Sequence, residues 1–152
     1  MQAEREWAKL RKKYKKLPDW KWIDDNFRVK IEEGTFAENV RLAVTDKLSH
    51  IANDMIEPII GGSENYCCYF ERRMLSVVER ERLFDVYRQL MALQWVSNHI
   101  AVDFSEKDFA NWMITVYNGL EKLKPIIIEM FDKLALGWSE YKKPPTDTSY
   151  HG

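Results

Sequence analysis

Apolar residues recur at intervals of three and four along most of this 152-residue chain, a spacing that places them on one face of an α-helix. The longest such run lies within residues 76–104. Its main seam consists of Leu83, Val86, Leu90, Leu93 and Val96. Ser76 and Glu79 precede the seam in the Ser-x-x-Glu order of a capping box, which satisfies two backbone donors at a helix start. The pattern therefore predicts one long helix that begins after Ser76.

A second apolar stripe widens this seam. It consists of Phe84, Tyr87, Met91 and Trp95. Together the two stripes make the predicted helix apolar around most of its circumference. Such a helix lies either in the middle of a bundle or at a subunit interface, so we take the four residues of the second stripe as candidate interface residues.

Two shorter amphipathic segments precede this helix. Residues 2–16 carry apolar side chains at helical spacing, and Pro18 ends the pattern. Residues 19–33 repeat the spacing, and Gly34 follows them as a natural C-cap. The sequence predicts a helix in each segment.

A further helix is predicted after Thr35, which stands in capping-box order with Glu38. Its seam consists of Val40, Val44, Leu48, Ile51 and Met55. We expect this helix to end near Glu57, because Pro58 disfavours helical geometry in the residue before it.

The remaining segments are less regular. In residues 63–75, Ser63 either caps a short separate helix or lies ahead of one continuous, kinked helix. A last helix is predicted after Ser105, with a bend or a restart at Pro125 and with Gly137 as its cap.

These elements predict an all-α fold, a single-domain antiparallel bundle of four to six helices. We assign residues 1–34 to a helical N-terminal arm that either packs on its own bundle or swaps onto a neighbour. Residues 35–141 form the predicted bundle. Residues 142–152 are polar and contain prolines, so we expect a frayed tail.

Charge is divided unevenly along the chain, although the net charge is −1. Residues 1–22 hold eight basic and three acidic residues, and the rest of the chain carries a net charge of −6. A basic arm on an acidic body suits nucleic acid, an anionic membrane surface or another subunit. The candidate nucleic-acid contacts are Arg11, Lys12, Lys13, Lys15 and Lys16, with Trp7 and Tyr14 as stacking rings. The same aromatics also stand at core spacing, in which case the lysines are ordinary solvated charge.

Sequence signals for catalysis or metal binding are weak. None of the three histidines has the Glu-x-x-His spacing of di-iron bundles, and the nearest approach to a ligand cluster is Asp46, His50 and Asp54. Cys67 and Cys68 are adjacent, which suits neither a zinc site nor an unstrained disulfide. We therefore predict no metal, no cofactor and two free thiols.

The N-terminus is charged, and no apolar run approaches the roughly 18 residues that a transmembrane helix needs. Together with the free thiols, these features predict a protein of the reducing cytoplasm without a membrane span.

A polar group interrupts the central helix. It consists of Gln94, Ser97, Asn98 and His99. Buried polar side chains require hydrogen-bond partners. The group therefore forms a structural network, faces solvent or lines a small ligand pocket inside the bundle.

The surplus of apolar and aromatic residues favours a non-enzymatic interaction or scaffold module, a homo-oligomer or a subunit of a larger intracellular complex. The first alternative is a nucleic-acid-binding protein that uses the basic arm. The second is a ligand carrier or a metal-dependent enzyme that uses His50 or the polar group of the central helix.

Overall fold

The computed structural model describes residues 2–61 and 65–142, and every regular element in these ranges is a helix. α3 (Phe36–Ser49), η1 (His50–Ile56) and α4 (Glu57–Ile60) follow one another without a break and form one rod. The other helices are α1 (Gln2–Lys13), α2 (Trp20–Phe27), α5 (Tyr66–Met74), α6 (Val77–Val102) and α7 (Glu106–Ser139). With the rod counted once, the described residues contain six helices, which confirms the predicted all-α bundle.

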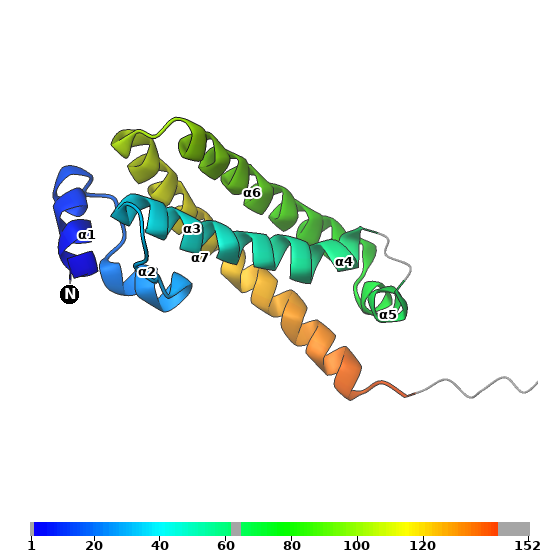
Figure 1. The fold of residues 1–152 in the computed structure, drawn as a ribbon. Coiled ribbons are helices and arrows are strands. Elements are labelled where there is room, and N and C mark those ends of the chain that lie inside the picture. Colours follow the sequence, from blue (N-terminus) through cyan, green and yellow to red (C-terminus); the bar gives the residue numbers. More distant parts are fainter. Residues whose placement is uncertain (1, 62–64, 143–152) are drawn as a thin grey trace, which may run out of the picture.

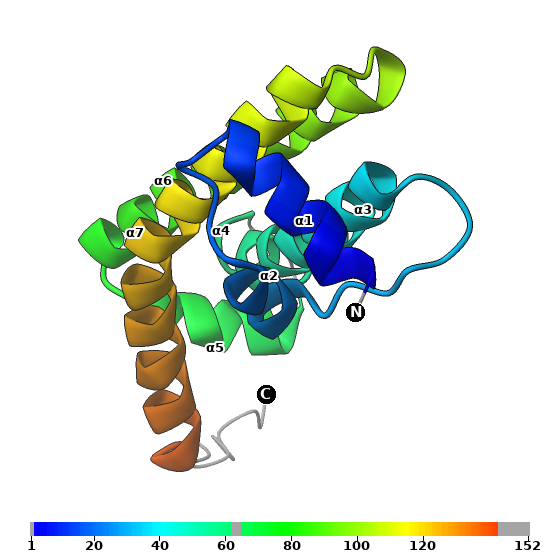
Figure 2. The same cartoon turned by 90° about the vertical axis from the view of Figure 1, so that its left-hand side faces the viewer.

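Three long elements form the body of the molecule (Figure 1). α6 runs antiparallel to the α3–η1–α4 rod, and α7 turns back along α6 after a short connection. α1 and α2 lie at the end of the body where α6 turns into α7, and α5 lies at the opposite end (Figures 1 and 2). The N-terminal arm and the α6–α7 turn, far apart in the sequence, are therefore neighbours in space.

Three helix starts predicted from the sequence are confirmed. At α6, Ser76 Oγ accepts from the amide of Glu79 at 3.2 Å, and the Ser76 amide donates to Glu79 Oε2 at 2.7 Å. At α3, Thr35 Oγ1 accepts from the amide of Glu38 at 3.2 Å. At α7, Ser105 caps the helix in the same way. Local capping chemistry is thus sufficient to place these starts.

The two N-terminal helices are shorter than predicted. α1 ends at Lys13 rather than at residue 16. α2 ends at Phe27 because Arg28 adopts a left-handed conformation with φ of 49° and its amide donates to Asp24 O at 2.9 Å. The expected C-cap, Gly34, also has a positive φ of 110°, but it lies in the non-helical link to α3. Closure by Arg28 explains why the helix stops before the apolar pattern does.

The rod continues beyond Glu57, so the predicted end there is wrong. Its buried row is Val40, Val44, Leu48, Ala52, Ile56 and Ile59, which replaces the predicted Ile51 and Met55. Residues four apart drift by about 40° per step around an α-helix. The π-helical turn η1, in which the Glu57 amide bonds to Ala52 O, is wider and keeps this row facing the core. Pro58 then stands in the first turn of α4, where a missing amide hydrogen costs little.

α5 is a separate helix, and its cap is Asn65, whose side chain accepts from the amide of Cys67 at 2.9 Å. Leu75 has an extended backbone between α5 and α6, so the alternative of one continuous, kinked helix is wrong. The other proposed cap, Ser63, lies outside the described residues.

α7 continues through Pro125 without a restart and runs past Gly137 to Ser139. Gly137 is therefore not a cap. A Cβ at Gly137 would lie 2.5 Å from Sδ of Met74, so glycine here permits the close packing of α5 against α7. Of the predicted frayed tail, residues 143–152 lie outside the described residues.

The predicted main seam of α6 is buried except for Val96, which is 48% exposed. From Leu93 the inward row continues four residues on at Ser97, rather than three residues on at Val96. α6 thus has one buried face and one exposed face. The expectation that it lies in the middle of the bundle is wrong, and the interface alternative stays a prediction.

Candidate functional site

The four candidate interface residues lie on the exposed face of α6 and form what we call the outer stripe (Phe84, Tyr87, Met91, Trp95). Trp95 is 68% exposed and Phe84 is 54% exposed, whereas Tyr87 and Met91 are half-buried. The rings of Phe84 and Tyr87 stack with their centroids 6.5 Å apart. Val102, 90% exposed, lies on the same helix seven residues beyond Trp95. An apolar row therefore follows this face of α6.

The polar group of α6 divides between its two faces. Gln94 and Ser97 are buried, while Asn98 and His99 are exposed. Gln94 Oε1 accepts from the hydroxyl of Ser49 at 2.7 Å. These contacts make Gln94 part of a structural link between α6 and α3.

Ser97 belongs to the same link. Its Oγ lies 2.7 Å from Oγ1 of Thr45 and accepts from Nη1 of Arg41 at 3.3 Å. Buried side chains that find such partners hold helices in one register. The structural-network interpretation therefore describes Gln94 and Ser97, and the solvent-facing one describes Asn98 and His99.

The aromatic residues of the basic arm are largely covered. Trp7 is 1% exposed, its Nε1 donates to Pro18 O at 2.9 Å, and its ring packs against Trp20 and Phe36. Tyr14 is half-buried. The Trp7 ring consequently offers no free face on which a base can stack.

The basic side chains of the arm differ in their contacts with the rest of the protein. Arg11 Nε donates to Leu17 O at 3.1 Å, and Lys13 Nζ donates to Glu106 Oε1 at 3.0 Å. The hydrogen bond to Glu106 raises the pKa of Lys13 above its ordinary value. Lys12, Lys15 and Lys16 are exposed. Nucleic-acid binding by the arm stays a prediction, and it rests on these solvated charges rather than on stacking.

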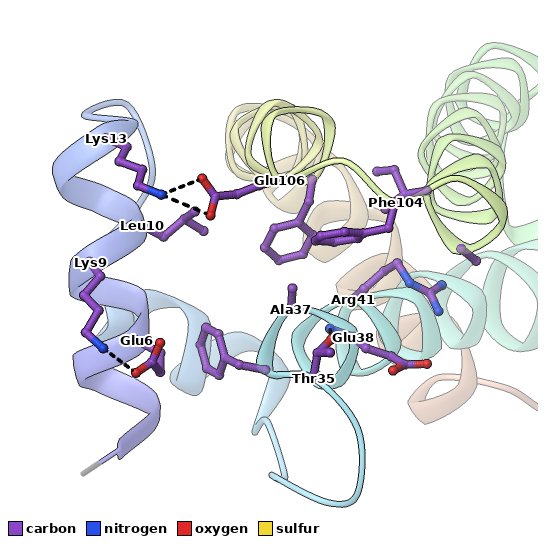
Figure 3. A pocket seen from close by; sticks show the side chains of 14 residues that line it. Glu6, Lys9, Leu10, Lys13, Thr35, Ala37, Glu38, Arg41, Phe104 and Glu106 are labelled. Carbon is purple, nitrogen blue, oxygen red and sulfur yellow. Dashed lines mark hydrogen bonds and ion pairs between the residues drawn. The ribbon is translucent and has the colours of Figure 1, made fainter.

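A cleft of about 610 Å³ lies between α1, the start of α3 and the α6–α7 turn (Figure 3). Its apolar lining consists of Leu10, Phe36, Ala37, Ile100, Ala101, Phe104 and Phe109. Its charged lining consists of Glu6, Lys9, Lys13, Glu38, Arg41 and Glu106. Sequence reasoning missed this cleft, because each apolar residue fits the core pattern of its own helix and the helices that contribute them are far apart in the sequence.

Ion pairs occupy the α1 side of the cleft. Lys9 Nζ lies 2.7 Å from Glu6 Oε1, and Lys13 joins α1 to Glu106 of α7 (Figure 3). Arg41 lies on the side away from α1, where its guanidinium donates to Ser97. Within the part of the chain that the structure describes, neither Arg41 nor Glu38 forms an ion pair.

The candidate metal ligands and the two thiols do not come together as a binding site. His50 Nδ1 lies 2.7 Å from Asp54 Oδ2 on the exposed side of the rod. Across residues 2–61 and 65–142, no three side chains of His, Cys, Asp or Glu come together as a metal site. Cys67 is exposed and Cys68 is half-buried, and both are free thiols.

A cluster of aromatic rings at the end of the bundle away from the cleft was also not predicted from the sequence. Phe70 of α5 packs edge-on against Tyr66 and Tyr141, with ring centroids 4.5 and 4.9 Å away. The hydroxyls of Tyr66 and Tyr141 lie 3.1 Å apart, and this hydrogen bond raises the pKa of Tyr141. The cluster fastens α5 to the end of α7.

Fold and sites together define an all-α helical bundle with an exposed apolar helix face and an amphipathic cleft. None of its described helices combines the length and the apolar character that crossing a bilayer requires. Comparison with protein-family models, with curated proteins and with solved structures finds no match to this chain.

Proposed function

We propose that this protein is a non-enzymatic interaction module that associates with a second copy of itself through the outer stripe of α6. The observation that carries the proposal is the exposure of Trp95 in line with Phe84 and Met91. Contiguous apolar surface of this kind marks interaction sites, and Trp and Tyr are enriched among the residues that dominate binding energy.

The charge pattern of α6 supports this proposal. Residues 89–102 contain no Asp, Glu, Lys or Arg, although the chain as a whole is 31% charged. The exposed face of α6 over these residues, which include Met91 and Trp95, therefore carries no charged residue, and interface centres are depleted in charged residues. Charged residues instead stand in the first half of α6, where Asp85 pairs with Arg88 at 3.0 Å.

The spacing of the outer stripe indicates the geometry of association. Its members recur at three, four and four residues, the spacing of the contact seam between two packed helices. In an antiparallel pair of α6 helices related by a two-fold axis, the same surface serves both copies. Tyr87 of each copy then approaches Trp95 of the other, with Met91 near the axis.

The experiment is native mass spectrometry and sedimentation analysis of the full chain over a range of protein and salt concentrations. We expect a dimer or higher oligomer that Trp95→Glu converts to a monomer. Ile128→Glu is the matched control, because Ile128 is also an exposed apolar residue but lies on α7. A wild-type monomer at every concentration would refute the proposal.

The basic arm favours a second function less strongly. Lys12, Lys15 and Lys16 are exposed, but the buried Trp7 cannot stack on a base. If the arm binds nucleic acid, a bound oligonucleotide mass is lost as salt rises, and replacing the three lysines by Glu abolishes binding without unfolding the protein.

A further inference from the structure

We propose that the cleft between α1, α3 and the α6–α7 turn binds a small molecule that has an apolar body and one carboxylate group. Its volume of about 610 Å³ falls in the range of small-molecule sites, which extends from about 300 to 1,000 Å³. Such sites combine a mainly apolar lining with a few polar groups that orient the ligand. This inference is independent of self-association through the outer stripe.

The apolar part of the lining comes from three directions. Leu10 contributes from α1, Phe36 from the start of α3, and Ile100 and Phe109 from the two helices that flank the α6–α7 turn. Phe104, in the turn itself, is 56% exposed. A ligand in the cleft would cover this ring, and burial of apolar surface favours binding.

Arg41 is the group that recognises the carboxylate. The two lysines of the cleft are already paired with Glu6 and Glu106, whereas Arg41 has a single hydroxyl partner, Ser97. Ser97 is buried and is itself held by Thr45, so one edge of the guanidinium is anchored. A planar guanidinium held in this way has further N–H donors for a carboxylate, which it can bind in bidentate geometry.

The other charges of the cleft decide between a carboxylate and a more highly charged anion. Three basic and three acidic side chains line it, and Glu38 stands one helical turn before Arg41. The lining therefore has no net charge. Glu38 repels either anion, and Arg41 is the one cation among the described residues of the lining that stands outside an ion pair, so it offsets the charge of a carboxylate but only about half that of a phosphate dianion.

The test uses dodecanoate below its micellar concentration as the probe, with binding measured by calorimetry on the full chain. Dodecanol has the same apolar body without the carboxylate, and dodecyl phosphate carries the higher charge. We expect wild-type protein to bind dodecanoate more tightly than either. Arg41→Gln should weaken dodecanoate about tenfold or more and leave dodecanol unchanged.

Two further variants distinguish a loss of ligand contacts from a general effect of mutation on the fold. Ala101→Phe places a ring in the cleft from an exposed position and should weaken both dodecanoate and dodecanol. Arg88→Gln removes an arginine outside the cleft and should change neither. No binding to wild-type protein, equal binding to Arg41→Gln, or a preference for dodecyl phosphate would each overturn the proposal, and none of these results depends on the oligomeric state.

Discussion

The two faces of α6 contradict the simple rule that apolar residues lie inside and polar residues outside. The inner face buries Gln94 and Ser97 against α3, while the outer face leaves Trp95 exposed to solvent. Both faces also contain apolar residues at helical spacing. What separates them is the neighbouring elements, because α3 and α7 contact α6 on the side of Gln94 and Ser97, whereas Trp95 stays exposed.

The comparison teaches that a side chain of α6 is buried where a neighbouring helix covers it and supplies any hydrogen bonds it needs. Gln94 and Ser97 are stable inside the protein because Ser49 and Thr45 supply hydrogen bonds that replace those of water. Trp95 is left outside because no described helix packs over it. In our proposal a second copy of the chain supplies that missing cover.

The largest expected effect is the truncation of a fully buried residue on the inner face. Leu90 is 0% exposed, and Leu90→Ala should lower the free energy of unfolding by about 2–5 kcal/mol through lost burial and a residual cavity. Phe84→Ala, on the outer face, is the matched variant and should cost about 0.5 kcal/mol or less in the monomer. Urea denaturation measures both, and equal losses would break the comparison.

The hydrogen-bonded pair between α6 and α3 should contribute less. Ser97→Ala removes one hydrogen-bond partner from Thr45 and one from Arg41, which are both half-buried, and should cost about 0.5–1.5 kcal/mol. A double-mutant cycle with Thr45→Ala isolates the coupling between the two hydroxyls. Additive losses in that cycle would show that the link does not depend on the contact between them.

The ion pair between Glu79, at the start of α6, and Lys133 of α7 should contribute still less to stability. Hydrogen bonds from Lys133 and from the Ser76 amide lower the pKa of Glu79 from 4.5 to about 2. The stabilisation is therefore complete above pH 4.5 and is lost as the pH falls through about 2. Glu79→Gln should destabilise the protein at neutral pH, and its difference from the wild type should shrink over that acid range. Glu81→Gln, which removes a neighbouring carboxylate without these hydrogen bonds, is the control.

The smallest effect on monomer stability is expected at the most exposed residue of the outer stripe. Trp95→Ala should change the free energy of unfolding of the monomer by about 0.5 kcal/mol or less, because the ring is 68% exposed. In denaturation at low protein concentration the variant should match the wild type, while at high concentration it should lose the added stability that self-association provides. A large loss at low concentration would show that Trp95 packs within its own chain.

Much of the fold was predictable from local signals. The starts at Thr35, Ser76 and Ser105 follow from hydrogen bonds within one turn, and the all-α class follows from apolar spacing. The end of α2 was not predictable in this way, since Arg28 adopts a positive φ that glycine usually supplies. The π-helical turn was not predictable either, because the packing of the rod against the core determines it rather than the residues of the turn.

The candidate sites also differ in whether the sequence could predict them. The sequence identified the outer stripe from its spacing, but it could not determine which of the two stripes of α6 is buried. It also could not bring Leu10, Arg41 and Phe109 to one cleft, because they belong to three different helices.

The sequence by itself determined where most helices begin, which residues can share a helix face, and the basic character of the arm, since these properties depend on neighbours within a few residues. Only the tertiary structure decided that Ser97 is buried instead of Val96, that Trp7 is covered, and that Arg41 stands in an amphipathic cleft. These outcomes depend on which surfaces meet, and that is set by the joint burial and hydrogen bonding of distant segments rather than by any one of them.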